Sequence, residues 1–138
     1  MSNISVIIPV YNEANTIYSF LLYLHKMNSN NIMEFLVIDG GSTDGTQKII
    51  SEFSKKNEKF KRIDSKKGRA IQMNIGATKS SGHILYFLHA DSLPPEKYDK
   101  YIIEAIDHGS GSGCFRMKFD SAHWILKIAG WLTQLNIK

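Results

Sequence analysis

The chain has 138 residues, 43% of them hydrophobic and 22% charged, and a formal net charge of +4. This length and composition are typical of one globular domain with a hydrophobic core, and they exclude a low-complexity chain. Cys114 is the only cysteine, which excludes an internal disulfide and a metal site built on several thiolates. No apolar run is long enough to cross a bilayer and the N-terminus lacks a secretory signal pattern, so we expect a cytoplasmic protein.

Most of the excess positive charge lies in residues 55–69. Such a run is usually a solvated face, and the alternative is attraction of an anionic ligand such as a phosphate. Phe60 is the only aromatic residue within the run, so we expect no nucleic-acid partner.

Apolar runs alternate with amphipathic segments along the chain. Strands are expected at residues 4–9, 35–38, 62–64, 84–88 and 114–119, and helices at 13–27, 45–53, 69–78, from 94 onward and at 124–135. The first strand should end at Pro9, because proline cannot donate to a ladder. Thr43 or Asp44 is the expected N-cap of the second helix. Regular alternation of strand and helix predicts an α/β fold, a three-layer α/β/α sandwich with a mostly parallel sheet in one domain.

Three of the predicted strands run into acidic loops marked by glycine or proline. These loops are residues 9–13, 39–45 and 89–92. In a parallel sheet they lie at one edge, outside the carboxyl ends of the strands, where α/β folds bind ligands. The sequence therefore predicts a crevice that collects acidic groups from distant parts of the chain.

Asp39 is the leading candidate for ligand contact in this crevice. It follows a buried-looking strand and precedes Gly40 and Gly41, which allow a tight turn and a close approach of the ligand. A carboxylate here can accept hydrogen bonds from a nucleobase imide or a ribose hydroxyl. The alternative is a turn aspartate that caps the next helix, a role that suits Asp44 better.

His89 and Asp91 are candidate metal ligands. On an extended segment, positions i and i+2 point to the same side, so both side chains could face one ion. Carboxylates suit Mg²⁺ or Mn²⁺, and an added imidazole favours Mn²⁺. For His89 the alternative is a histidine satisfied by ordinary hydrogen bonds.

Three further residues are candidate nucleotide contacts. Arg69 opens a helix beside Lys67, and a helix N-terminus with a guanidinium is a natural anion site. Tyr11 would either stack on a base or cover the sheet edge. Glu13 would either contact the ligand or serve as a first-turn acid of its helix.

Four stretches resemble a known family. They are residues 5–13 (SVIIPVYNE), 37–46 (VIDGGSTDGT), 68–77 (GRAIQMNIGA) and 85–91 (LYFLHAD). Together they resemble the family 2 glycosyltransferases of the GT-A type. The third and fourth resemble a bacterial subgroup, the radical-SAM/selenodomain-associated transferase 2 type. The resemblance extends to about residue 119 and implies a strand order of 3-2-1-4 plus a fifth strand.

The resemblance implies an enzyme that moves a sugar from a nucleotide-diphosphate donor to an acceptor with the help of Mn²⁺ or Mg²⁺. Asp91 matches the last carboxylate of the family's Asp-x-Asp motif. His89 replaces the first Asp of that motif, and Gly40 replaces a second Asp often found after the second strand. The residues expected to hold the nucleotide sugar are Pro9, Tyr11, Glu13, Asp39, Arg69, Ala90 and Asp91; those expected to hold the metal are Asp91 and His89.

The resemblance also implies a longer protein. Family members continue beyond this length, and their second half supplies the acceptor site and a catalytic carboxylate. We therefore expect residues 1–138 to be the donor half, truncated at the C-terminus, with the general base beyond Lys138. The apolar helix at 124–135 then needs a partner, and we expect a homo-oligomer, with a membrane surface as the weaker alternative.

Two other functions stay open. One is a non-catalytic nucleotide-binding or assembly module that lacks the acceptor half. The other is a nucleotidyltransferase on a similar fold, although its expected glycine-rich basic signature near the N-terminus is missing. The sugar, the base and the acceptor are not identified by the sequence.

Overall fold

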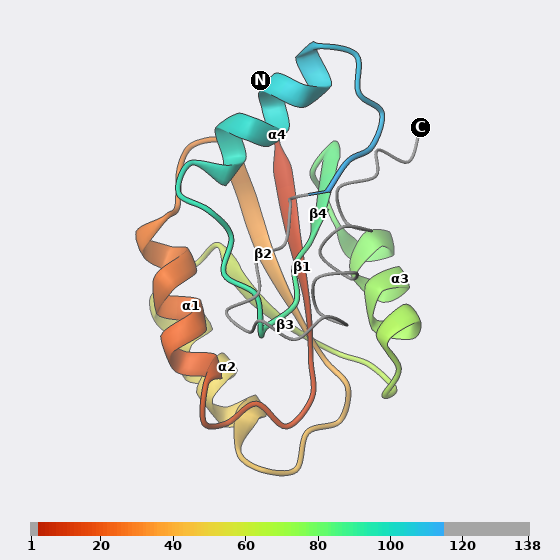
Figure 1. Cartoon of the computed structure of the whole chain (residues 1–138). Coiled ribbons are helices and arrows are strands. Elements are labelled where there is room, and N and C mark those ends of the chain that lie inside the picture. The colour runs from red at the N-terminus through yellow and green to blue at the C-terminus, as the bar shows by residue number, and fades with distance from the viewer. Residues whose placement is uncertain (1–2, 115–138) are drawn as a thin grey trace, which may run out of the picture. The chain divides into compact units, whose positions relative to one another are not determined.

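The computed structural model describes residues 3–114, in which strands and helices alternate (Figure 1). The chain divides into two compact units, Met1–Asp99 and Lys100–Lys138. In chain order the elements are β1 (Ile4–Val10), α1 (Ile17–Lys26), β2 (Ile32–Asp39), α2 (Thr46–Lys56), β3 (Phe60–Asp64), α3 (Arg69–Lys79), β4 (Ile84–Phe87) and α4 (Tyr98–Asp107). The predicted fifth strand, apart from Cys114, and the predicted helix at 124–135 with its oligomer contact lie outside the described residues.

The first unit is built on a four-stranded parallel sheet of order β3-β2-β1-β4. This order confirms the prediction 3-2-1-4. Helices α1 and α2 cover one face of the sheet and α3 covers the other (Figure 1). The predicted three-layer α/β/α arrangement is therefore confirmed for this unit, and the loops after β1 and β2 lie at one edge.

Both faces of the sheet are packed with apolar side chains, which explains why β1 and β2 read as continuous apolar runs. Beneath α1 and α2, the Phe35 ring stacks on Phe60 with centroids 4.2 Å apart, and Phe53 meets Phe60 edge-on at 4.9 Å. On the α3 face, Gly76 allows close approach of helix and sheet. A Cβ there would lie 2.4 Å from the Ile7 side chain.

Several predicted boundaries are wrong: β3, for example, begins at Phe60 rather than at residue 62. Three of the differences have a clear local reason. The strand β1 continues past Pro9 to Val10, whose carbonyl accepts from the N–H of Gly40 at 3.0 Å. Helix α1 begins at Ile17 rather than at residue 13, after a turn at residues 14–16. Helix α4 begins at Tyr98 because Lys97 takes a left-handed φ of 62°, which interrupts the helix.

The amino end of the sheet is closed by hydrogen bonds to Glu34, which is 2% exposed. Its Oε1 accepts from the Ser5 hydroxyl at 2.8 Å and from the N–H of Ser81 at 2.7 Å, and its Oε2 accepts from Lys61 at 3.0 Å. Ser5 in turn accepts from the N–H of Gly82 at 2.9 Å. These bonds join β1, β2 and β3 to the turn that precedes β4.

None of the helices in the described part of the chain is both long and apolar enough to span a membrane.

Candidate functional site at the carboxyl edge of the sheet

The loops that follow β1 and β2 are joined by hydrogen bonds that run in both directions. Ser42 Oγ accepts from the backbone N–H of Asn12 at 2.8 Å, and Asn12 Oδ1 accepts from the N–H of Thr43 at 2.8 Å. Thr46 Oγ1 accepts from the N–H of Glu13 at 2.9 Å. Asn12 has a positive φ of 50°, which asparagine tolerates better than most residues. These two loops therefore lie together at one edge of the sheet, as predicted for a parallel sheet.

Asp39 ends β2, and its side chain is fully buried. Its Oδ2 accepts three hydrogen bonds, from the N–H groups of Gly41 and Ser42 at 3.1 Å and from Gln47 Nε2 at 2.6 Å. Its Oδ1 is buried and has no hydrogen-bond partner among the described residues. An unpaired buried acceptor costs about 1 to 3 kcal/mol. One oxygen thus holds the turn, and the other is left for a donor that the described residues do not supply.

The predicted N-cap, Thr43 or Asp44, is wrong because Gly45 occupies that position, but the Asp44 side chain still accepts hydrogen bonds at the start of α2. Its Oδ1 accepts from the Thr46 hydroxyl at 2.5 Å and from the Thr46 N–H at 3.1 Å, and its Oδ2 accepts from the N–H of Ala14 at 3.1 Å. The hydroxyl of Thr46 and these backbone donors lower the pKa of Asp44. The residue at the helix boundary itself is Gly45, with a φ of 99°.

Gln72 is a structural residue of the site that the sequence analysis missed. Its Nε2 donates to the carbonyls of Val10 and Ile38 at 2.9 and 2.8 Å, and its Oε1 accepts from the N–H of Gly68 at 3.3 Å. The buried amide therefore fixes the ends of β1 and β2 against the start of α3. A Cβ at Gly40 would lie 2.9 Å from Gln72 Cδ, so the glycine leaves the space that this side chain fills.

The ring of Tyr11 is covered by Lys67, whose Nζ lies 4.0 Å from the ring centroid. A cation above an aromatic face is attracted by the ring quadrupole. Lys67 is exposed and Tyr11 is partly buried. A base that stacks on this face of Tyr11 therefore has to replace the ammonium group of Lys67.

Arg69, the first residue of α3, meets His89, which follows β4. A guanidinium nitrogen of Arg69 forms a hydrogen bond with His89 Nε2. Burial lowers the pKa of His89, and the positive charge of Arg69 lowers it further. The charge of Asp91 acts to raise this pKa but does not outweigh the other two effects. The contact brings the start of α3 against the segment after β4.

The segment that carries His89 and Asp91 is not extended, so the geometric reason for placing both side chains on one side is wrong. Ala90 and Asp91 occupy a turn that is closed by a hydrogen bond from the N–H of Ser92 to the carbonyl of His89 at 3.0 Å. Asp91 is exposed, and its Oδ1 accepts from the Ser92 hydroxyl at 3.2 Å.

A divalent ion fits Asp91 better than His89. Asp91 presents an exposed carboxylate, the ligand type that Mg²⁺ and Mn²⁺ prefer, whereas His89 Nε2 already contacts Arg69. Within residues 3–114, no group of three or more His, Cys, Asp or Glu side chains could hold a metal ion. An ion at Asp91 would therefore take further ligands from phosphate groups and water, as Mg²⁺ commonly does.

The remaining predicted site residues lie along the same elements. Glu13 is partly buried, and its Oε2 accepts from the Thr16 hydroxyl at 3.1 Å. It precedes α1, so its alternative role as a first-turn acid is wrong. Pro9 lies in β1 opposite Ile38, and Ala90 lies in the turn after β4. Their contacts with a ligand stay predictions.

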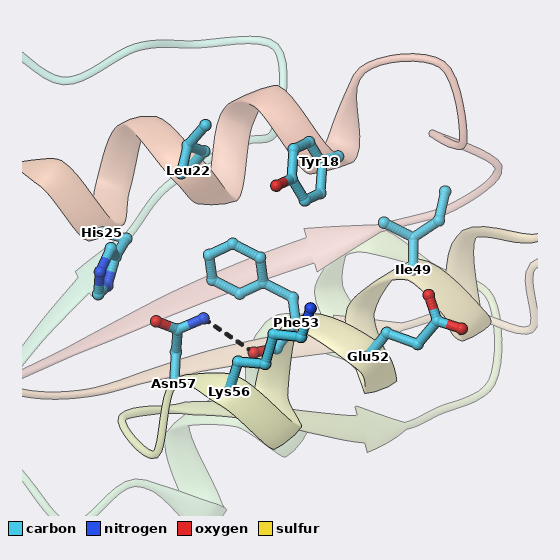
Figure 2. A pocket seen from close by; sticks show the side chains of 8 residues that line it. All are labelled: Tyr18, Leu22, His25, Ile49, Glu52, Phe53, Lys56 and Asn57. Carbon is cyan, nitrogen blue, oxygen red and sulfur yellow. Dashed lines mark hydrogen bonds between the residues drawn. The ribbon is translucent and has the colours of Figure 1, made fainter.

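A pocket of about 440 Å³ lies elsewhere, between α1 and α2 (Figure 2). The Phe53 ring is flanked by Tyr18 and His25, with centroid distances of 6.1 and 6.3 Å. The lining residues are Tyr18, Leu22, His25, Ile49, Glu52, Phe53, Lys56 and Asn57. None of them is a predicted site residue, so this pocket is distinct from the carboxyl edge.

Comparisons with known proteins point to one family. The family model described as "Glycosyl transferase family 2" matches residues 5–127. The glycosyltransferase AglE of Haloferax volcanii is 36% identical over 113 residues, which cover 80% of this chain and 36% of AglE. The chain thus spans about a third of the length of that relative.

Solved structures share the fold. Residues 1–349 of S. aureus TarS in complex with UDP superpose with a TM-score of 0.71 at 24% identity, covering 89% of this chain and 37% of that one. The mannosyltransferase PcManGT from Pyrobaculum calidifontis, in complex with GDP-Man and Mn²⁺, gives a TM-score of 0.65 at 22% identity, covering 83% and 35%.

Proposed function

Because the chain belongs to glycosyl transferase family 2, we propose that the carboxyl edge of its sheet binds a nucleotide-diphosphate sugar, and that the complete protein transfers the sugar to an acceptor. The parallel sheet of order 3-2-1-4 is the GT-A arrangement of the structural neighbours. Since TarS was solved with UDP and PcManGT with GDP-Man, uridine and guanosine donors are both candidates.

The buried Oδ1 of Asp39 carries this proposal. It is an acceptor with no donor among the described residues, beside an oxygen that already accepts three hydrogen bonds. The imide N–H of a pyrimidine base, the ring N–H of guanine and a ribose hydroxyl are complementary donors. Because Oδ1 is buried, the atoms that cover it have to move before a ligand can reach it.

The other groups at this edge suit the rest of a nucleotide diphosphate. Tyr11 offers an aromatic face for the base once Lys67 moves, and Arg69 at the N-terminus of α3 supplies a guanidinium for the diphosphate. Asp91 would hold Mn²⁺ or Mg²⁺, which neutralises the diphosphate as a leaving group when bound. The acceptor hydroxyl would be deprotonated by a base beyond Lys138.

We also propose three finer assignments: a subgroup, a location and self-association. The stretches at residues 68–77 and 85–91 favour the bacterial radical-SAM/selenodomain-associated transferase 2 subgroup. A cytoplasmic location is the second of these assignments. The apolar composition of residues 124–135 supports self-association, with a membrane surface as the alternative. Light scattering of the whole chain tests this assignment, and a monomer at all concentrations would contradict self-association.

Titration calorimetry with UDP, GDP and TDP, each with Mn²⁺ and with a chelator, tests the proposed function. We expect at least one nucleotide to bind, more tightly with Mn²⁺, and we expect Asp91→Ala to remove the metal-dependent part. Absence of binding at millimolar nucleotide would refute the proposal. Slow hydrolysis of a nucleotide sugar would distinguish an enzyme from a donor-binding module.

A further inference from the structure

We infer that His89 is a positioning residue for Arg69: its Nε2 accepts a hydrogen bond from the guanidinium and holds that group where the donor diphosphate binds. This inference rests on the proposed function. It assigns to His89 a role different from the metal ligation that its place in the Asp-x-Asp motif suggests.

The first step is that the backbone around His89 is fixed. The N–H of Leu88 donates to the carbonyl of Ile7 at 2.9 Å, which continues the pairing of β4 with β1. The carbonyl of His89 accepts from the N–H of Ser92 at 3.0 Å, which closes the turn. His89 is also partly buried. The backbone that carries the imidazole is therefore fixed on both sides of His89.

The second step is the direction of the hydrogen bond. A guanidinium has only donors, so His89 Nε2 has to be the acceptor and the proton has to lie on Nδ1. An Nε2 lone pair that accepts from Arg69 is not available to a metal ion, and a protonated Nδ1 cannot coordinate one. Ligation by His89 would require this contact to break.

The third step is what the contact does for Arg69. The side chain is long, exposed and placed at the first turn of α3, where the backbone N–H groups also favour an anion. Immobilising such a side chain on binding weakens affinity by about threefold to tenfold. A guanidinium already held by His89 avoids part of that loss, and its remaining donors stay available for phosphate oxygens.

The test compares four variants of the whole chain with the wild type: His89→Leu, His89→Gln, Arg69→Gln and the double variant Arg69→Gln/His89→Leu. Glutamine keeps an acceptor at a similar distance from the backbone, whereas leucine keeps the bulk and removes the acceptor. Calorimetry with UDP and GDP is run with Mn²⁺ and with a chelator.

We expect His89→Leu to weaken nucleotide binding about threefold to tenfold, by the same factor with and without Mn²⁺. His89→Gln should restore most of the loss, and the double variant should bind no worse than Arg69→Gln. A loss confined to the Mn²⁺ condition would identify His89 as a metal ligand and overturn the inference. Additive losses in the double variant would also overturn it, because the two residues would then act independently.

A second readout does not need a nucleotide. Long-range proton–nitrogen NMR correlation reports which nitrogen of a neutral histidine carries the proton, and the His89 signal is assigned from its loss in His89→Leu. We expect the Nδ1–H form in the wild type and a shift towards the Nε2–H form in Arg69→Gln. An Nε2–H form in the wild type would overturn the inference.

The two readouts separate the two proposals. A wild type that binds no nucleotide refutes the proposed function and this role together. A wild type that binds nucleotide while His89→Leu binds equally well refutes only the role of His89.

Discussion

Two buried carboxylates on the same strand, Glu34 and Asp39, lie at opposite ends of the sheet and are satisfied in different ways. Glu34 is 2% exposed and Asp39 is fully buried. Both oxygens of Glu34 accept hydrogen bonds from Ser5, Ser81 and Lys61. At Asp39, one oxygen accepts three bonds and the other none within residues 3–114. The two carboxylates are therefore alike in burial and differ in the unpaired oxygen of Asp39, on which its proposed role depends.

The largest change in the free energy of unfolding is expected for Glu34→Leu. Removing the acceptor leaves the buried hydroxyl of Ser5 and the N–H of Ser81 without this partner, and a buried group that loses its partner costs about 1 to 3 kcal/mol. We expect the free energy of unfolding to fall by about 3 kcal/mol in chemical denaturation. Nucleotide affinity should stay within about twofold of wild type at temperatures where the variant is folded. A tenfold loss of affinity would contradict the separation of the two ends.

Asp39→Asn tests the other end. If the amide oxygen keeps the three donors of Oδ2, the amide nitrogen faces the ligand as a donor in place of the unpaired oxygen. A hydrogen bond to a charged group contributes about 1.5 to 3 kcal/mol, so nucleotide affinity should fall about tenfold to hundredfold in calorimetry. The free energy of unfolding should change by less than about 1 kcal/mol, because a buried charge with an unpaired oxygen is removed. A large loss of stability with unchanged binding would make Asp39 purely structural.

Gly40→Ala tests how the site is supported. The new Cβ would lie 2.9 Å from Gln72, whose amide is held by two strand-end carbonyls. We expect about 1.5 kcal/mol of destabilisation, in the usual range for overpacking, and a severalfold loss of nucleotide affinity.

Two glycines serve as controls for Gly40→Ala. A Cβ at Gly111 meets nothing within 4 Å, so Gly111→Ala should change neither quantity. A Cβ at Gly82 would lie 2.8 Å from the backbone N of Ser5, so Gly82→Ala should lower stability and leave affinity unchanged. Equal effects of Gly40→Ala and Gly111→Ala would refute the steric role of Gln72.

The smallest expected effect is a pH dependence at Glu34. Burial acts to raise its pKa, but the hydrogen bonds from Ser81, Ser5 and Lys61 outweigh burial and hold the pKa below its ordinary value of 4.5. A lowered pKa in the folded state stabilises the fold above the unfolded-state value, and this contribution is lost as pH falls through the folded-state pKa.

Chemical denaturation of wild type and Glu34→Gln from pH 7 downward measures that contribution. The wild type should be about 1 kcal/mol more stable at neutral pH, and the difference should shrink below pH 4.5. A difference that stays constant down to the lowest pH would mean that the charge of Glu34 contributes nothing.

Much of the fold could be predicted because its signals are local. β-branched runs predicted the central strands, and regular alternation with amphipathic segments predicted parallel pairing. The observed strand order was implied by the family resemblance rather than by local signals. Boundaries were harder, since the left-handed φ of Lys97 and the turn before Ile17 depend on neighbouring loops rather than on periodicity.

The sequence predicted which loops form the site, but it did not predict the contacts that individual atoms make there. The sequence predicted that Asp39 lies at the ligand edge, but the different states of its two oxygens depend on the turn and on Gln47. The extended geometry assigned to His89 failed because the turn bond from Ser92 cannot be read from residue types. Gln72 had one usable signal: it is a polar residue one helical turn before Gly76, on the side of α3 that packs on the sheet.

The reciprocal bonds between the loops after β1 and β2 have a consequence for redesign. Asn12 lies in the loop after β1. It accepts from the N–H of Thr43 and donates its own N–H to Ser42, and both partners lie in the loop after β2. Each loop therefore depends on the other for its shape. Grafting a single loop from a homologue with a different donor preference would leave backbone groups in both loops without partners. Chimaeras that aim to change the preferred base should therefore transplant residues 11–14 and 39–46 as one cassette.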